Sequence, residues 1–266
     1  MLGWHVGGCL VWLLLILTFV RPSTGDSSGL GSVNGAAQAL SLFGRRRVLG
    51  AVSASGDSVA LCRVEEVDEV VKDGAEKKKQ SRVLVEGSEE GDAVVQLSPR
   101  CALALSGWKA DRRFLVEQVK SAISAHQART GTQPPIEEVS HIIADFLHRM
   151  AINKMLRPLV VSCLLGGVDE WGLAQLYKIG TDGSVERSRA ATSAYSGASG
   201  LGEGQGLALG KSLSRDEEVA VAAMQSCLEG GEGAEEETVA EALKGTKGLR
   251  LSPSSLLVLR ATVNSK

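Results

Sequence analysis

The chain has 266 residues and a mass of 27.9 kDa, enough for one large domain with a full hydrophobic core. Its hydrophobic fraction is 44% and its mean hydropathy is +0.05, values that exclude an intrinsically disordered chain. The formal net charge is -2 and the pI is about 6.1, so the chain lacks the strong basic field of a nucleic-acid-binding protein.

The first residues differ in composition from all that follow. Positions 9–20 are apolar apart from Thr18, and positions 23–25 are small residues of the kind that a signal peptidase accepts. The apolar run is shorter than a comfortable membrane span and has the length of the hydrophobic region of a signal peptide. We therefore expect residues 1–25 to be a cleaved signal peptide and residues 26–266 to form a single domain. An uncleaved anchor and a wrongly assigned first exon are the alternatives.

The first half of the domain is predicted to begin with a short helix and a hairpin. Helical spacing of small apolar residues predicts a helical stretch over 33–43. Residues 47–54 and 58–64 are predicted strands, and the Ser55-Gly56-Asp57 sequence is a hairpin turn between them. Residues 65–93 are rich in charge of both signs, which indicates a solvated loop.

Strands and helices follow in clear order after residue 93. A second strand pair is predicted at 94–97 and 101–106, followed by helices over 110–128 and from Pro135 onward. Ser214 and Glu217 form a capping box ahead of one further helix. The remaining predicted elements are strands at 159–168, 174–179, 190–196 and 255–263 and the helix at 219–228.

This order predicts an α+β fold. Hairpin turns between successive strands favour antiparallel pairing, and helices on the outer faces of two sheets would bury the apolar stripes. The four cysteines after the leader match no CxxC or zinc spacing and are predicted to be buried free thiols: Cys62, Cys101, Cys163 and Cys227. The histidines form no HExxH motif, so we expect no metal site and no cofactor.

One segment carries a specific resemblance. Residues 157–170 read RPLVVSCLLGGVDE and are similar to the RPFGVSLLIAGVDE run of proteasome subunits. The positions that keep the family residue include Arg157, Pro158, Gly167 and Asp169.

Three further segments point to the α-type branch of that family. Residues 106–113, SGWKADRR, resemble the α-type SGLTADAR, and residues 124–145 resemble the α-type segment that ends in Ile-Ala-Asp. Residues 32–39 resemble the N-terminal QVEYAxEA helix that distinguishes α-type from β-type subunits. The matched residues in these motifs are Gly107, Ala110, Asp111 and Arg113, and in the N-terminal helix Val33, Ala36 and Ala39. The resemblance implies a four-layer αββα sandwich of two antiparallel sheets, the N-terminal-nucleophile hydrolase fold.

The resemblance also implies what the chain lacks. Active members of the family cut peptide bonds with a processed N-terminal Thr that an Asp and a Lys support. The matching positions here are the strand start at Arg46-Arg47, then Cys62 and Ala93, so we expect no hydrolysis. A leader cleaved after Gly25 would expose serines too far ahead of the strand to reach its end.

Ala93 has a second implied consequence. In α-type rings a Lys at this place pairs with the C-terminal carboxylate of an activator, and Gly107 lies near the same pocket. Ala93 removes the cation, which argues against docking there. A turn at the end of a strand explains Gly107 equally well.

The resemblance therefore predicts a non-catalytic scaffold and gating subunit of the α ring of a proteasome core particle. Its implied partners are other α and β subunits, activators and unfolded polypeptide substrates, with no nucleic acid and, after leader cleavage, no membrane. The alternatives are a divergent β-type threonine peptidase and a secreted or tethered binding protein that kept the fold. If the leader is a signal peptide, we expect the protein to lie in the endomembrane system or in a compartment around a plastid. The alternative location is the cytoplasm and nucleus, as for ordinary proteasomes.

Overall fold

The fold is known from a computed structural model. It describes residues 35–36, 39–40, 46–66, 93–153, 155–187, 192–195, 215–229, 239, 241, 249–251 and 256–261. The predicted leader at 1–25, Val33 of the predicted N-terminal helix and Ser214 of the capping box lie outside these residues. Within the described part of the chain, no helix has both the length and the apolar character that a membrane crossing requires.

The first sheet contains the N-terminal hairpin. Its strand order is β10-β2-β1-β8, β9 pairs with β2, and all of these pairings are antiparallel. The hairpin turn was predicted at 55–57 and lies at 53–57, because β1 ends two residues earlier than predicted. Ser53 accepts the amide hydrogens of Asp57 and Ser58 at its hydroxyl oxygen (3.1 Å each). The strands are β1 (Arg46–Val52), β2 (Ser58–Glu66), β8 (Thr192–Tyr195), β9 (Leu249–Leu251) and β10 (Leu257–Arg260).

The second sheet is a simple antiparallel meander. Its order, β3-β4-β5-β6-β7, is the order of the chain. All eight residues of β5 are buried, which explains why this strand reads as a continuous apolar run. The strands are β3 (Val94–Ser98), β4 (Cys101–Gly107), β5 (Val161–Val168), β6 (Ala174–Ile179) and β7 (Val185–Arg187).

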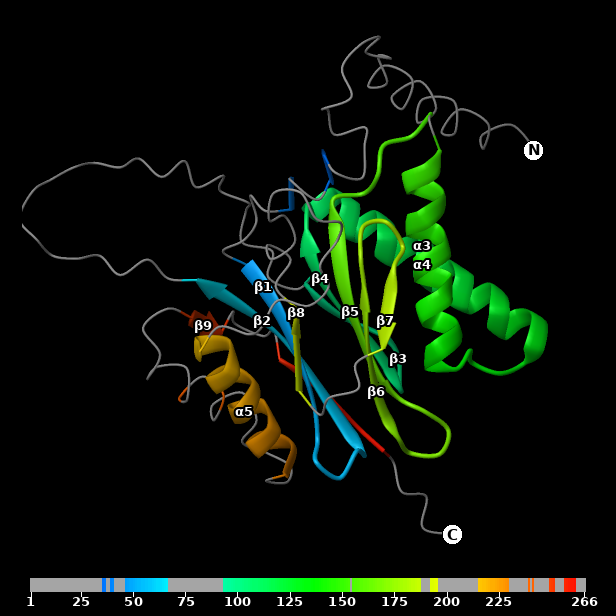
Figure 1. The fold of residues 1–266 in the computed structure, drawn as a ribbon. Coiled ribbons are helices and arrows are strands. Elements are labelled where there is room, and N and C mark those ends of the chain that lie inside the picture. Colours follow the sequence, from blue (N-terminus) through cyan, green and yellow to red (C-terminus); the bar gives the residue numbers. More distant parts are fainter. Residues whose placement is uncertain are drawn as a thin grey trace, which may run out of the picture.

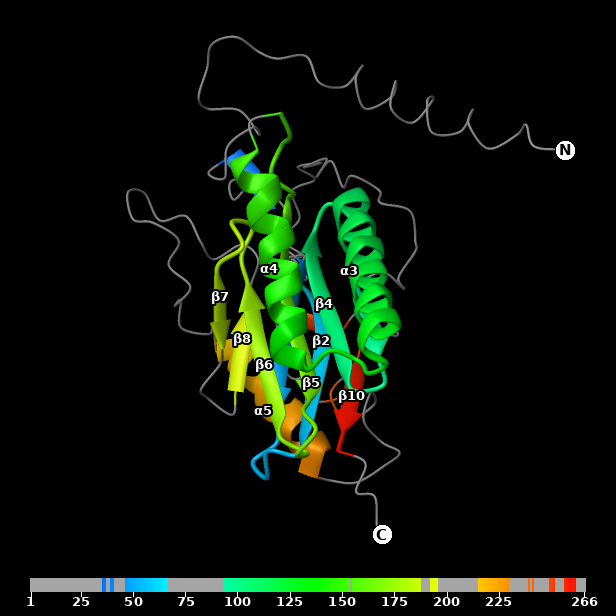
Figure 2. The same cartoon turned by 90° about the vertical axis from the view of Figure 1, so that its right-hand side faces the viewer.

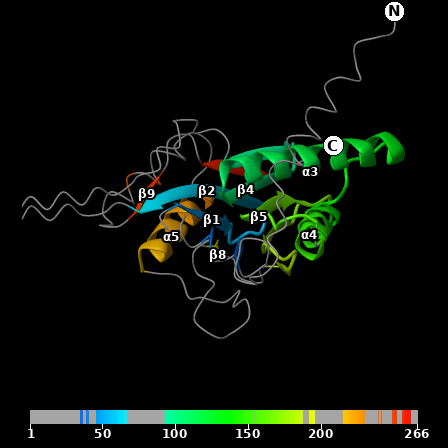
Figure 3. The same ribbon diagram turned by 90° about the horizontal axis from the view of Figure 1, so that it is seen from above.

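Three helices cover the outer faces of the sheets. Helices α3 (Lys109–Thr130) and α4 (Ile136–Ile152) pack on the second sheet, and α5 (Arg215–Glu229) packs on the first (Figures 1 and 2). Leu61 of β2 and Leu164 of β5 belong to the apolar layer between the two sheets. Seen from above, the layers follow one another as helix, sheet, sheet and helix (Figure 3). The predicted αββα sandwich is therefore confirmed.

The two ends of the sandwich differ. At one end, which we call the hairpin end, the β1–β2 turn bonds to the neighbouring segments: the Ala174 amide donates to Gly56 O (2.7 Å) and the Ala261 amide to Asp57 O (2.9 Å). The β5–β6 turn, residues 169–173, lies at this end too. At the opposite end, which we call the Gly107 end, β1 starts, β4 finishes and α3 begins.

The four cysteines after the leader are buried, as predicted. Burial raises the pKa of Cys62, Cys101 and Cys163 to about 12 from the usual 9.0. The nucleophile in alkylation is the thiolate, which is about a thousandfold scarcer at pH 8 when the pKa is three units higher.

We therefore expect iodoacetamide at pH 8 to leave these three thiols unmodified in the native chain and to modify them fully in urea, as read by peptide mass spectrometry. Because unfolded thiols ionise above pH 9 while folded ones stay protonated, their contribution to stability is complete below pH 9 and is lost between pH 9 and about 12. Equal labelling rates with and without urea would contradict the prediction.

Candidate functional site

The described residues before β1 pack onto the Gly107 end. Residues 35–36 and 39–40 are helical, and Ala36, Ala39 and Leu40 are buried against Val160, with Trp108 packed alongside. The described residues ahead of β1 are thus part of the packed structure, and two of the predicted N-terminal helix residues, Ala36 and Ala39, contribute to this contact.

Gly107 makes this close packing possible. Its φ is +123°, a conformation that only glycine adopts without strain. A β-carbon at this position would overlap the carbonyl oxygen of Val160 and would lie 3.0 Å from Cδ2 of Leu40. That same carbonyl accepts the amide hydrogen of Trp108 at 3.0 Å. Gly107 is therefore required by the contact between the end of β4 and the segment that leads into β5.

A bidentate ion pair fixes the first turn of α3 to the segment before β5. Nη1 of Arg157 lies 2.8 Å from Oδ2 of Asp111, and Nη2 lies 2.6 Å from Oδ1. The Val160 amide also donates to Oδ2 at 2.8 Å. The Asp111 side chain is 5% exposed and the Arg157 side chain 42%. Hydrogen bonds to Asp111 raise the pKa of Arg157 above its usual value, so the guanidinium stays charged.

Trp108 links the ion pair to the N-terminal residues. The guanidinium carbon of Arg157 lies 5.2 Å from the centre of the indole ring, within the range of a cation–π contact. Nη1 also donates to the carbonyl of Pro158 at 3.2 Å. These contacts connect four of the motif residues, Gly107, Asp111, Arg157 and Pro158, and we call this connected set the N-terminal seat. Ala110 and Arg113, in contrast, lie exposed on the first turn of α3.

Two of the other motif residues lie at the hairpin end and shape its turns. Asp169 accepts the amide hydrogens of Trp171 (2.9 Å) and Leu173 (2.8 Å) on Oδ1 and the Gln175 side-chain amide on Oδ2 (2.9 Å). A β-carbon at Gly167 would lie 2.5 Å from the carbonyl oxygen of Arg100. Both residues therefore serve the fold of this end.

Two of the positions matched to the catalytic groups, Cys62 and Ala93, carry neither a carboxylate nor a cation. Cys62 lies on the face of β2 that packs under α5, with its Sγ 3.4 Å from Sδ of Met224. Ala93 is 1% exposed, and its carbonyl accepts the amide hydrogen of Leu105 at 2.7 Å. Neither side chain carries a group that exchanges a proton near neutral pH. The described residues also contain no cluster of three His, Cys, Asp or Glu side chains that could hold a metal ion.

Sequence reasoning missed a charged residue beside Cys62. Arg63 is 7% exposed, and because neighbouring strand residues face opposite ways, it lies on the side of β2 that Val59 and Leu61 share. That side faces the second sheet. Only the strand register, with Cys62 opposite Leu49 in the layer under α5, distinguishes the two faces.

Comparison with known proteins adds a family match. A family model described as proteasome subunit matches residues 68–230, more than half of the chain. Proteasome subunit alpha type-3 of Arabidopsis thaliana is 30% identical over 110 residues, which cover 41% of this chain and 43% of the relative. The alpha type-3 subunit of Dictyostelium discoideum is 31% identical over 134 residues, 50% of this chain and 51% of the relative.

A β-type protein also matches. Proteasome subunit beta of Methanothermobacter thermautotrophicus is 28% identical over 94 residues, 35% of this chain and 42% of the relative. The chain thus spans about half the length, or less, of the curated relatives that it matches.

Proposed function

The chain belongs to the proteasome subunit family, and from that premise we propose that it is a non-catalytic scaffold subunit of the α ring of a proteasome core particle. In this role it contributes one position of a ring and helps to admit unfolded polypeptides to a proteolytic chamber built by other subunits. Its partners are other α-type and β-type subunits. The names of its relatives, mostly α-type, support the branch.

The packing at the Gly107 end carries the proposal. An N-terminal-nucleophile hydrolase needs a free amine at the start of its first strand, because the amine serves as the base. Here Ala36, Ala39 and Leu40 precede β1 and are packed against Val160. Cleavage in front of Arg46 would remove these contacts from the fold. A scaffold role requires no such cleavage and keeps the contacts of Ala36, Ala39 and Leu40 with Val160.

The chemistry of the matched positions favours the same role over that of a peptidase. Ala93 has no cation with which to lower a neighbouring pKa, and burial holds the Cys62 thiol protonated with a pKa of about 12. An activator carboxylate would likewise find no cation at Ala93. We propose that an activator which binds this ring uses pockets that neighbouring subunits supply.

Native fractionation tests the proposal. The full-length chain, tagged at its C-terminus in its own cells, is separated on a gradient, and fractions are treated with a covalent probe for N-terminal threonine nucleophiles. We expect the chain to sediment with α-type and β-type subunits, and the probe to label other bands but none at the mass of this chain. A free monomer without such partners contradicts the scaffold role, and a labelled band of this chain contradicts its lack of activity.

A further inference from the structure

An unusually exposed tryptophan lies at the hairpin end. Trp171, in the β5–β6 turn, is 83% exposed, and Leu173 beside it is 56% exposed. Tryptophan is among the residues most often found at the energetic centre of protein interfaces, since it buries a large area and loses little side-chain freedom. The N-terminal seat does not involve either side chain, so this apolar tip has no role in the site described above.

The turn that presents Trp171 is held in one shape. Oδ1 of Asp169 accepts the amide hydrogens of both Trp171 and Leu173, and the Gly172 amide donates to the Asp169 carbonyl at 3.2 Å. Gly172 has a φ of +82°, which closes the turn. A backbone ordered in advance lowers the entropy cost of binding. Asp169 therefore holds the apolar tip ready for contact.

A cavity lies next to this turn on the same end. It has a volume of about 350 Å³ and is bounded by the β3–β4 turn, the start of α4 and the end of β5. Three prolines, Pro99, Pro134 and Pro135, give it an apolar wall, and Ile136 extends that wall. Trp171 is not among its lining residues, so the chain's own indole does not fill it. The volume is sufficient for an indole ring.

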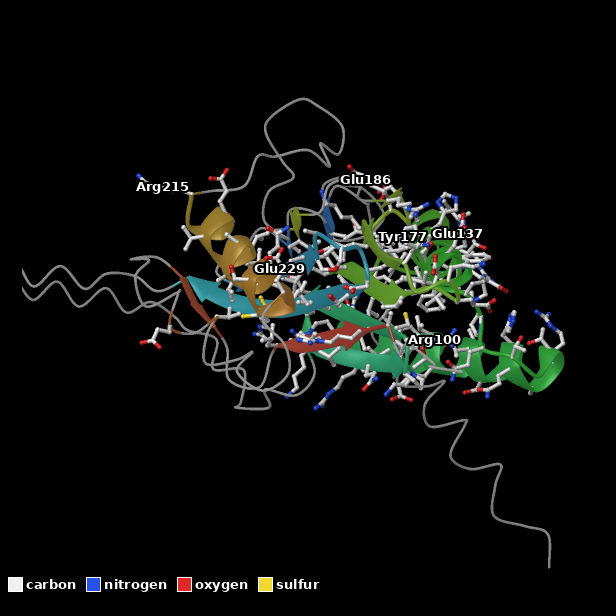
Figure 4. The ribbon with its side chains drawn as sticks, turned by 90° about the horizontal axis from the view of Figure 1, so that it is seen from below. Arg100, Glu137, Tyr177, Glu186, Arg215 and Glu229 are labelled. Atoms are coloured by element: carbon white, nitrogen blue, oxygen red, sulfur yellow. The ribbon has the colours of Figure 1, made fainter. Side chains whose placement is uncertain are left out.

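Three charged residues line the cavity: Arg100, Glu170 and the buried Asp169, whose carboxylate is bonded within the β5–β6 turn. Of these, Arg100 and Glu170 are exposed, and they carry opposite charges. Figure 4 views the molecule from this end and labels Arg100 on the loop that follows β3. A surface that carries an exposed indole, a cavity and opposite charges has the parts that a contact with a second copy of itself requires. In a two-fold contact each copy's Arg100 can meet the other copy's Glu170, and each Trp171 can enter the other copy's cavity.

We propose that the hairpin end is a two-fold contact with a second copy of this chain, in which Trp171 of each copy fills the proline-lined cavity of the other. The contact uses the end opposite the N-terminal seat. It is independent of the scaffold role, since two isolated chains or two chains in separate rings can form it.

The test is sedimentation velocity of the full-length chain over roughly 1 to 100 µM, a range suited to micromolar association. We expect reversible doubling of the mass, and Trp171→Ala to weaken it by at least about 30-fold. Val219→Ala, at a 39% exposed site on α5, is the matched control and leaves the association unchanged. If the chain forms a larger assembly through other surfaces, Trp171→Ala halves its mass.

A charge exchange tests the pairing itself. Arg100→Glu and Glu170→Arg each weaken association by about fivefold or more, because each places like charges opposite one another, and the double variant restores it to within about twofold. A chain that stays monomeric over the whole range overturns the proposal. So does a Trp171→Ala variant that associates like the wild type, or a double variant that restores nothing.

Discussion

Replacing Gly107 with alanine is expected to lower the free energy of unfolding by roughly 3 to 5 kcal/mol, among the largest effects of any single change in this chain. The alanine would keep a φ near +123°, and its β-carbon would overlap the Val160 carbonyl oxygen. To relieve that overlap the two backbone segments must separate. Separation lengthens the Trp108–Val160 hydrogen bond, now 3.0 Å, and weakens the packing of Leu40 against Val160. Both losses add to the strain.

Gly131→Ala is the matched control. Gly131 ends α3 with a φ of +78°, but a β-carbon there would meet nothing within 4 Å. The control therefore reports the conformational cost of positive φ without a steric clash, about 1 kcal/mol. Urea unfolding followed by far-ultraviolet circular dichroism measures both variants. If they lose the same stability, backbone conformation alone accounts for Gly107, and the close contact with Val160 carries no energy.

The sequence predicted the layers of this fold well because their signals are local. The apolar run of β5 and the helical stripe of α4, with Ile136, Val139 and Ile143 buried, are visible within single segments. The helix predicted at 110–128 extends to Thr130, where Gly131 ends it. The short strands β7 and β9, of three residues each, were not predicted, since three residues carry no period.

The candidate site was less accessible from sequence because it depends on long-range pairing. The motif residues Asp111 and Arg157 were both identified, but 46 positions separate them, and nothing in the pattern paired them. Asp169 and Gly167, from the same motif as Arg157, lie at the other end of the sandwich. Periodicity alone also gave no sign that the end carrying Asp169 holds a cavity.

Asp111→Ala is expected to destabilise the fold by about 3 kcal/mol. The substitution leaves the buried Val160 amide without its acceptor and releases Arg157 from the first turn of α3. Because the Arg157 side chain is 42% exposed, water stabilises the freed guanidinium, and the loss stays below that of a fully buried ion pair. Most of the effect therefore comes from the orphaned amide and the lost tie between the two segments.

Two comparisons separate these contributions. Asp111→Asn keeps an acceptor for the Val160 amide but removes the charge, so we expect it to lose about half as much free energy of unfolding as the alanine variant. Glu117→Ala, at an exposed site on the same helix, is the control and changes the free energy of unfolding by less than about 0.5 kcal/mol. A double-mutant cycle of Asp111→Ala with Arg157→Ala should give a coupling energy of about 1 to 2 kcal/mol that 0.5 M salt changes little, since the carboxylate is buried. A coupling energy near zero would show that the two side chains stabilise the N-terminal seat separately, with the Val160 hydrogen bond as the sole reason for a carboxylate at position 111.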